Sequence, residues 1–166
     1  MTELAHIGLK PVESTVCPCC GKAFPATGLA PLTAVHCPAC NEPVRIQGRL
    51  GPFLITGILG EGGMGAVYRG TDTALERPVA VKVLQRQMAA GAEAIEGFRR
   101  EAQAAARMNH GNIARIYAFG VEDDQPYIVM EFVNGKPLMD FIDRIGALET
   151  RFVLHVGIQE IGRAHV

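Results

Sequence analysis

The chain has 166 residues, of which 48% are hydrophobic and 20% are charged, and its formal net charge at pH 7 is −1. This composition is typical of a globular protein, and the near-neutral charge argues against a polyanion as partner. No apolar run reaches the length of a membrane span, and the amino-terminal residues lack the basic start and apolar middle of a signal peptide. A cytoplasmic protein with no membrane segment in this chain is expected, although a longer parent protein could carry a span elsewhere.

After an amino-terminal tail, residues 1–14, the first expected element is a metal-binding segment. All five cysteines lie between residues 17 and 40, and an odd number of cysteines without a secretion signal argues against a disulfide framework. Two C-x-x-C pairs supply four thiolates, which close a tetrahedral Zn²⁺ site and leave no open position for catalysis. Reduced cysteines without a metal are the alternative. The expected ligands are Cys17, Cys20, Cys37 and Cys40.

Residues 15–47 resemble a zinc ribbon, which implies a structural Zn²⁺ that stabilises a segment too small to fold alone. Cys19 and His36 lie beside the ligands and are expected to be bystanders. A zinc ribbon can bind nucleic acid, bind protein or cap a neighbouring domain, and the sequence leaves this choice open. Nucleic acid is the least expected partner, because basic residues are sparse and Phe24 is the single aromatic residue of the segment.

Residues 48–52 are expected to be a linker, and the apolar run 53–59 is expected to be a strand that leads to a G-x-G-x-x-G motif at residues 60–65. This spacing brings backbone close to a phosphate in two unrelated folds. A dinucleotide-binding fold starts a helix at the glycines, but residues 66–71 contain a Val-Tyr pair and end in turn residues, which predicts the second strand of a hairpin. The absence of a following Gly-Lys-Ser/Thr excludes a P-loop.

Residues 78–84, PVAVKVL, are the next expected strand. A period of two places two sets of side chains on opposite faces, namely Val79, Val81 and Val83 on one and Ala80, Lys82 and Leu84 on the other. An ammonium group on such an apolar face is costly to bury without an anion. The alternative is an edge strand whose lysine reaches solvent.

Residues 92–110 are rich in Ala, Glu, Arg and Gln and predict a helix. Glu101 borders its apolar stripe at helical spacing, so Lys82 is the expected partner of its carboxylate. Pairing of Glu101 with Arg99 or another surface arginine is the alternative. The buried stripe is expected at Ile95, Phe98, Ala102 and Ala105.

The glycine motif, the V-A-V-K strand and the helical Glu101 follow one another in the order found in the amino-terminal lobe of protein kinases. The stretches GEGGMGAVY, REAQAAARMNHGNIARIY and YIVMEFVNGKPL resemble the eukaryotic-like serine/threonine kinases of bacteria in particular, and the resemblance covers residues 53–159. It implies an α+β fold, with an N-lobe made of a five-stranded antiparallel sheet and one helix, followed by the start of the C-lobe. It also implies transfer of the ATP γ-phosphoryl group, with Mg²⁺, to hydroxyl groups of a protein substrate.

The same resemblance implies roles for individual residues. Lys82 would hold the α- and β-phosphates and Glu101 would orient it, so these two are the expected catalytic residues. Met130 resembles the gatekeeper beside the adenine, and the backbone of Glu131 and Val133 would bond the base. Core packing alone is the alternative for that strand. The residues expected to bind ATP are Leu59, Gly60, Gly62, Gly63, Gly65, Val67, Ala80, Lys82, Met130, Glu131 and Val133.

Residues 136–146 predict a short helix, and residues 149–159 begin another that resembles the first long helix of a kinase C-lobe. The H-R-D motif with its downstream Asn and the D-F-G motif do not occur in these 166 residues, so the chain as printed is expected not to phosphorylate protein. One back-translation of residues 161–166 matches the start of a sequencing adapter. Residues 160–166 are therefore interpreted as a non-native tail on a truncated reading frame, with a genuine short protein as the alternative.

Two other functions fit parts of the sequence. A non-catalytic module that binds nucleotide or a protein partner would carry the same glycine motif and the same structural zinc ribbon. A ribbon-based nucleic-acid binder with a degenerate lobe would show binding that weakens with salt. The sequence downstream of residue 159 in the genome separates the kinase from both, because a kinase continues into H-R-D, Asn and D-F-G.

Overall fold

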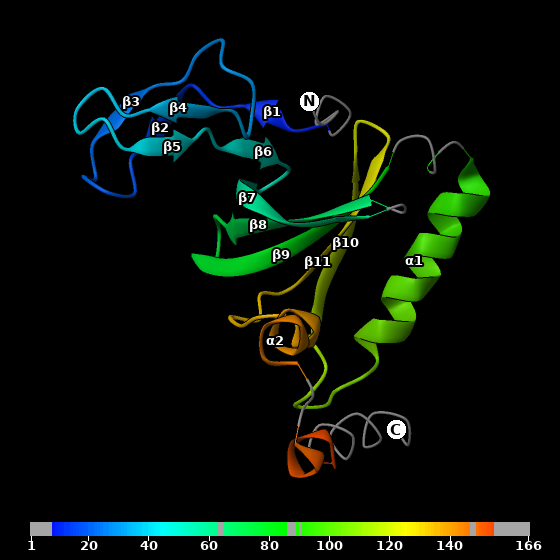
Figure 1. Ribbon diagram of the computed structural model, residues 1–166. Helices are drawn as coiled ribbons and strands as arrows, with labels where there is room; N and C mark the ends of the chain where they lie inside the picture. Colours follow the sequence, from blue (N-terminus) through cyan, green and yellow to red (C-terminus); the bar gives the residue numbers. More distant parts are fainter. Residues whose placement is uncertain (1–7, 63–64, 86–88, 90, 147–148, 155–166) are drawn as a thin grey trace.

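The structure is a computed structural model that describes residues 8–62, 65–85, 89, 91–146 and 149–154. Figure 1 shows a curled sheet with α1 along one side, the short strands β1 to β6 at one end, and α2 beyond the strands. Residues 150–154 are also helical. The elements are β1 (Lys10–Pro11), β2 (Ser14–Val16), β3 (Ala23–Pro25), β4 (Ala34–His36), β5 (Pro43–Arg45), β6 (Gly48–Leu50), β7 (Phe53–Gly62), β8 (Gly65–Asp72), β9 (Arg77–Leu84), α1 (Ala92–Ala106), β10 (Ile116–Glu122), β11 (Gln125–Glu131) and α2 (Leu138–Ile145).

The main sheet has seven strands in the order β1-β6-β7-β8-β9-β11-β10, and every neighbouring pair is antiparallel. Its last five strands are the expected antiparallel sheet of the N-lobe. We call β7 to β11 together with α1 the main lobe, and residues 8–50, which contain β1 to β6, the cysteine module. The sheet therefore runs without a break from the cysteine module into the main lobe.

Short strands also form in the expected linker at residues 48–52 and in the expected tail at residues 1–14. Gly48–Leu50 form β6, and the connection to β7 is shortened to the turn Gly51-Pro52. Leu50 is completely buried there, which explains why a segment without a visible period is ordered. Lys10–Pro11 form β1 on the outer side of β6.

The helix α1 packs on one face of the main sheet, which we call the helix face. Phe98 and Ala102 of α1 are buried against Leu84 of β9 and Ile128 of β11. Ile95 and Ala105, the other expected members of the stripe, are half-buried. The helix ends at Ala106, earlier than expected, shortly before Asn109, His110 and Gly111, which have low helix propensity.

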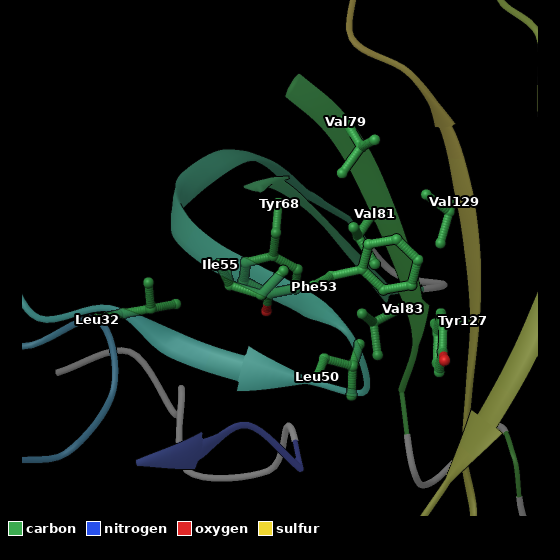
Figure 2. Packing of buried hydrophobic residues seen from close by; sticks show 10 residues of the cluster. All are labelled: Leu32, Leu50, Phe53, Ile55, Tyr68, Val79, Val81, Val83, Tyr127 and Val129. Carbon is green, nitrogen blue, oxygen red and sulfur yellow. The ribbon is translucent and has the colours of Figure 1, made fainter. Parts of the chain in front are cut away.

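The opposite face of the sheet, which we call the module face, carries the main core (Figure 2). The alternation predicted for β9 is observed, because Val79, Val81 and Val83 all lie in this core. Leu32 and Leu50 of the cysteine module complete it. The remaining members are Phe53, Ile55, Tyr68, Tyr127 and Val129. A second, smaller core lies within the cysteine module and consists of Cys17, Phe24, Ala26, Cys37, Val44 and Ile46.

Candidate functional site

The glycine motif lies at the tip of the hairpin formed by β7 and β8, as the sequence predicts. The two strands stay paired up to Gly62 and Gly65. A Cβ atom at Gly65, whose φ is +150°, would lie 2.0 Å from the carbonyl oxygen of Val83. Only glycine therefore allows the backbone at the start of β8 to lie this close to β9. A Cβ atom built at Gly60 or Gly62 meets no described atom within 4 Å, so backbone there is open to a ligand. Residue 63, also expected to bind ATP, lies outside the described residues.

Beneath the hairpin, several expected ATP-binding residues share the helix face. Directly opposed residues in antiparallel strands point to the same face, and Val67 lies opposite Lys82 while Ala80 lies opposite Met130. Ala80 is buried and Lys82 and Met130 are partly buried. Leu59 lies at the register irregularity between Ile58 and Gly60 in β7 and is 46% exposed. The register thus gathers an ammonium group and small or flexible apolar side chains under one glycine hairpin.

The structure brings Lys82 and Glu101 together. Lys82 Nζ lies 3.5 Å from Glu101 Oε1 and 5.6 Å from the ring centroid of Phe98. The lysine side chain is 27% exposed and the glutamate 65%, so the ammonium is the more enclosed partner. This ion pair joins β9 to α1 across the helix face.

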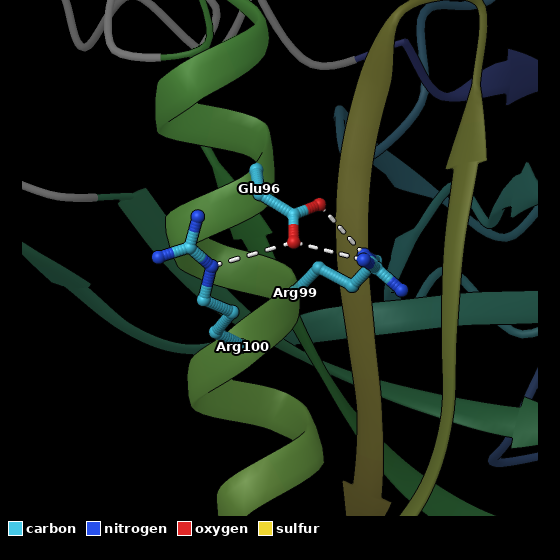
Figure 3. Close-up of polar contacts among 3 residues, drawn as sticks. All are labelled: Glu96, Arg99 and Arg100. Carbon is cyan, nitrogen blue, oxygen red and sulfur yellow. Dashed lines mark hydrogen bonds and ion pairs between the residues drawn. The ribbon is translucent and has the colours of Figure 1, made fainter.

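The alternative partner of Glu101, Arg99, is engaged elsewhere (Figure 3). Arg99 donates two hydrogen bonds of 2.8 Å to the carboxylate of Glu96, and Arg100 approaches the same carboxylate at 3.4 Å. The hydrogen bonds from Arg99 lower the pKa of Glu96, and the same contact raises the pKa of Arg99. Both arginines therefore neutralise Glu96, and Glu101 faces the lysine.

The end of β11, where the adenine-binding backbone is expected, is held on two sides. The backbone N–H of Glu131 donates to the carbonyl of Arg115 at 2.8 Å, and the Glu131 carboxylate accepts from the Arg115 N–H at 3.2 Å. The guanidinium of Arg69 lies 5.0 Å from the ring centroid of Phe132. Val133 is 65% exposed. Sequence reasoning missed Arg69, although the period of two places it on the same face of β8 as Val67.

The four expected metal ligands form one cluster in the cysteine module. Their sulfur atoms all lie within 4.8 Å of one another, with Cys17 Sγ 3.6 Å from Cys40 Sγ and Cys20 Sγ 3.8 Å from Cys37 Sγ. Zn–S bonds of about 2.3 Å in a tetrahedral site require S–S separations of about 3.8 Å. Cys19 is exposed and lies outside the cluster.

Each ligand pair lies at the tip of a short hairpin, and the two tips share one backbone pattern. The N–H of Gly21 donates to the carbonyl of Cys17 at 2.9 Å, and the N–H of Asn41 donates to that of Cys37 at 2.8 Å. Gly21 and Asn41 have φ values of 71° and 61°. Asparagine tolerates this left-handed conformation, which explains how Asn41 occupies the position that Gly21 has in the first hairpin.

Burial, backbone hydrogen bonds and the close approach of the sulfur atoms shift the pKa values of two thiols in opposite directions. Burial raises the pKa of Cys37, but the backbone N–H groups of Ala39 and Cys40 and the neighbouring thiols outweigh it and bring the pKa to about 7. For Cys40, a backbone hydrogen bond at Glu42 lowers the pKa, while burial and the neighbouring thiols raise it to about 12. Four thiolates this close together require a cation among them at neutral pH, and the donor set suits Zn²⁺.

Comparison with known proteins identifies the family. The model of the protein kinase domain matches residues 53–163, so the chain belongs to the protein kinase family. Serine/threonine-protein kinase PrkC of Bacillus subtilis (strain 168) is 42% identical over 124 residues, which cover 73% of this chain and 19% of PrkC. Serine/threonine-protein kinase PknA of Mycobacterium tuberculosis (strain ATCC 25618 / H37Rv) is 39% identical over 119 residues, which cover 69% of this chain and 27% of PknA.

The solved structures agree with this family and with the fold. The crystal structure of the Mycobacterium tuberculosis PknI kinase domain matches with a TM-score of 0.60 and 31% sequence identity, over 68% of this chain and 46% of that chain. The expected N-lobe fold and the expected likeness to bacterial serine/threonine kinases are thus confirmed. The chain spans only part of each relative's length. Among the described residues, no helix is long and apolar enough to span a membrane.

Proposed function

We propose that the chain is the amino-terminal part of an ATP-dependent serine/threonine protein kinase, which transfers the γ-phosphoryl group of ATP to hydroxyl groups of a protein substrate. The ion pair between Lys82 and Glu101 on the helix face, beneath the glycine hairpin, carries this proposal. The curated relatives PrkC and PknA are serine/threonine kinases, which supports it. The proposed kinase domain begins at Phe53 and includes residues up to 159.

In this proposal each part of the site has one task. Lys82 binds the α- and β-phosphates, and Glu101 keeps its ammonium group in place. Backbone at Gly60, Gly62 and Gly65, and at residue 63, lies over the phosphates. The adenine stacks against Leu59, Val67 and Ala80, beside Met130, and bonds to the backbone of Glu131 and Val133. Mg²⁺ bound with ATP would supply charge neutralisation, and the H-R-D-associated Asn and the D-F-G Asp that would hold it do not occur in these 166 residues.

The cysteine module holds one structural Zn²⁺ through Cys17, Cys20, Cys37 and Cys40, with residues 15–47 as the zinc ribbon. The sulfur separations and the four-thiolate donor set support this assignment. Use of four cysteines as metal ligands rather than in disulfides is typical of proteins of a reducing compartment, so we place this part of the protein in the cytoplasm.

Radiolabelled phosphate transfer tests the proposed activity. The protein extended with its genomic downstream sequence should phosphorylate protein hydroxyls and lose that activity with Lys82→Met. The 166-residue chain should transfer no phosphate above background. A downstream sequence without H-R-D and D-F-G motifs would instead favour a non-catalytic nucleotide-binding module, and activity of the 166-residue chain that Lys82→Met removes would refute the assignment of the missing catalytic residues.

A further inference from the structure

The cysteine module and the main lobe share one sheet. In the hairpin of β6 and β7, Gly48 pairs with Ile55 and Leu50 pairs with Phe53. Lys10 of β1 pairs with Arg49 on the other side of β6. β7 is the strand that ends at Gly62 in the glycine hairpin, so the edge of the nucleotide-binding sheet is covered by residues that precede the kinase domain.

The two units also share one core, and Leu32 makes the contact from the middle of the cysteine module. Its side chain is 4% exposed and lies at the margin of the core cluster on the module face, on the side of Leu50 and Ile55 (Figure 2). Leu32 has a φ of 65°, a left-handed conformation that leucine rarely adopts. The backbone holds this conformation because its N–H donates to Ile46 at 2.7 Å and its carbonyl accepts from the Arg45 guanidinium at 3.0 Å.

Tight polar and steric contacts accompany the shared core. Lys10 Nζ lies 2.6 Å from Glu122 Oε1 and 3.5 Å from Asp123 Oδ2, at the turn between β10 and β11. The hydrogen bond to Glu122 raises the pKa of Lys10, because it stabilises the charged ammonium. A Cβ atom at Gly48 would lie 2.8 Å from the Cβ of Pro31, which leaves no room for a side chain between the loop that carries Leu32 and β6.

The metal ligands lie on both sides of the loop that carries Leu32, between β3 and β4. Cys17 and Cys20 belong to the hairpin of β2 and β3, and Cys37 and Cys40 to the hairpin of β4 and β5. Hairpins with three-residue strands are marginal alone, and two of the six members of the module core are ligands. The loop with Leu32 connects the two hairpins, so a metal that joins the hairpins also fixes both ends of this loop.

We infer that the cysteine module is a built-in docking partner of the nucleotide-binding lobe, and that metal bound by the four cysteines stabilises the sheet that carries the glycine hairpin. This inference rests on the metal site of the proposed function. The sequence leaves three roles open for a zinc ribbon, namely binding nucleic acid, binding protein and capping a neighbouring domain. The inferred role of this ribbon is the third, because the ribbon packs on the module face of the main lobe.

The test compares Leu32→Ala with Leu75→Ala in the full chain. Leu75 lies in the turn between β8 and β9 and is 64% exposed, so the same truncation creates no cavity there. Zinc content is measured by elemental analysis, stability by thermal unfolding, and opening of β7 to β9 by amide hydrogen exchange. Leu32→Ala should keep its zinc and lower the melting temperature by about 5–15 °C, while Leu75→Ala melts like the original chain.

Metal removal provides the second arm. Chelation of the original chain should accelerate exchange of amides in β7 to β9 by at least about tenfold, and added Zn²⁺ should reverse it. Zinc-loaded Leu32→Ala that melts like Leu75→Ala, or exchange that chelation leaves unchanged, would overturn the inference while the metal site stands. A wild-type chain without zinc would overturn the metal site and the coupling together. Neither arm depends on phosphoryl transfer, so failure of the proposed kinase activity would be recognised separately.

Discussion

Lys82 and Glu101 meet across the helix face with 3.5 Å between Nζ and Oε1, in a chain that contains only part of a kinase domain. We expect Glu101→Gln in the extended kinase to lower phosphoryl transfer by about 10²-fold, because the lysine loses its positioning partner. Initial rates of radiolabelled phosphate transfer measure this effect. Glu93→Gln is the matched control, since Glu93 is an exposed glutamate in the first turn of the same helix. Equal rates for the two variants would show that the ion pair has no positioning role.

The four clustered cysteines should each be needed for zinc. We expect one zinc per chain in protein purified without added metal, and near-zero zinc after Cys37→Ser combined with Cys40→Ser. Cys19→Ser should retain its zinc, because Cys19 lies outside the cluster. Acidification should release the metal as protons compete for the thiolates. Elemental analysis of the three proteins decides between this result and zinc content that is independent of Cys37 and Cys40.

Tyr68 is completely buried, and its Oη has no hydrogen-bond partner among the described residues. Tyr68→Phe should therefore stabilise the fold by about 1 kcal/mol at pH 7.5. Burial also raises the pKa of Tyr68 to about 12, from 10.0. The raised pKa destabilises the folded state when the phenol ionises in the unfolded chain. The pH-dependent contribution of Tyr68 to the free energy of unfolding is therefore fully present below pH 10 and is lost as the pH rises toward 12.

Denaturant unfolding at pH 7.5 and at about pH 11 measures both effects. The original chain should lose more stability between the two pH values than Tyr68→Phe does, because phenylalanine has no proton to release. Identical pH dependence of the two proteins, or a clear loss of stability in Tyr68→Phe at pH 7.5, would contradict this account of the buried hydroxyl.

Gly120 lies opposite Tyr127 in the pair of β10 and β11, and a Cβ atom there would come within 2.4 Å of the tyrosine ring. Gly120→Ala should destabilise the main lobe by about 1–3 kcal/mol, because the buried ring must shift. Gly97 of α1 is exposed, and a Cβ atom there meets no described atom within 4 Å. Gly97→Ala should instead stabilise the chain by up to about 1 kcal/mol through helix propensity. Opposite shifts of the denaturant midpoint are expected, and shifts of the same sign would refute this steric explanation.

The sequence by itself was enough for features that depend on short-range patterns. The period of two in β9 separates Val81 from Lys82, because successive side chains of a strand point to opposite faces. The turn residues after the glycines predict a hairpin, and helical spacing brings Glu101 beside the apolar stripe of α1. The paired C-x-x-C motifs likewise predict which four sulfur atoms cluster, since each short knuckle brings its two thiols to one side.

Only the tertiary structure decided how the two units are joined. β6 has three residues and no readable period, so its pairing with β7 depends on burial of Leu50 against residues far along the chain. Leu32 lies in a loop, and nothing local marks it for a left-handed conformation inside another unit's core. Such contacts become favourable only when distant segments bury apolar surface together, and a pattern within one segment carries no information about that partner.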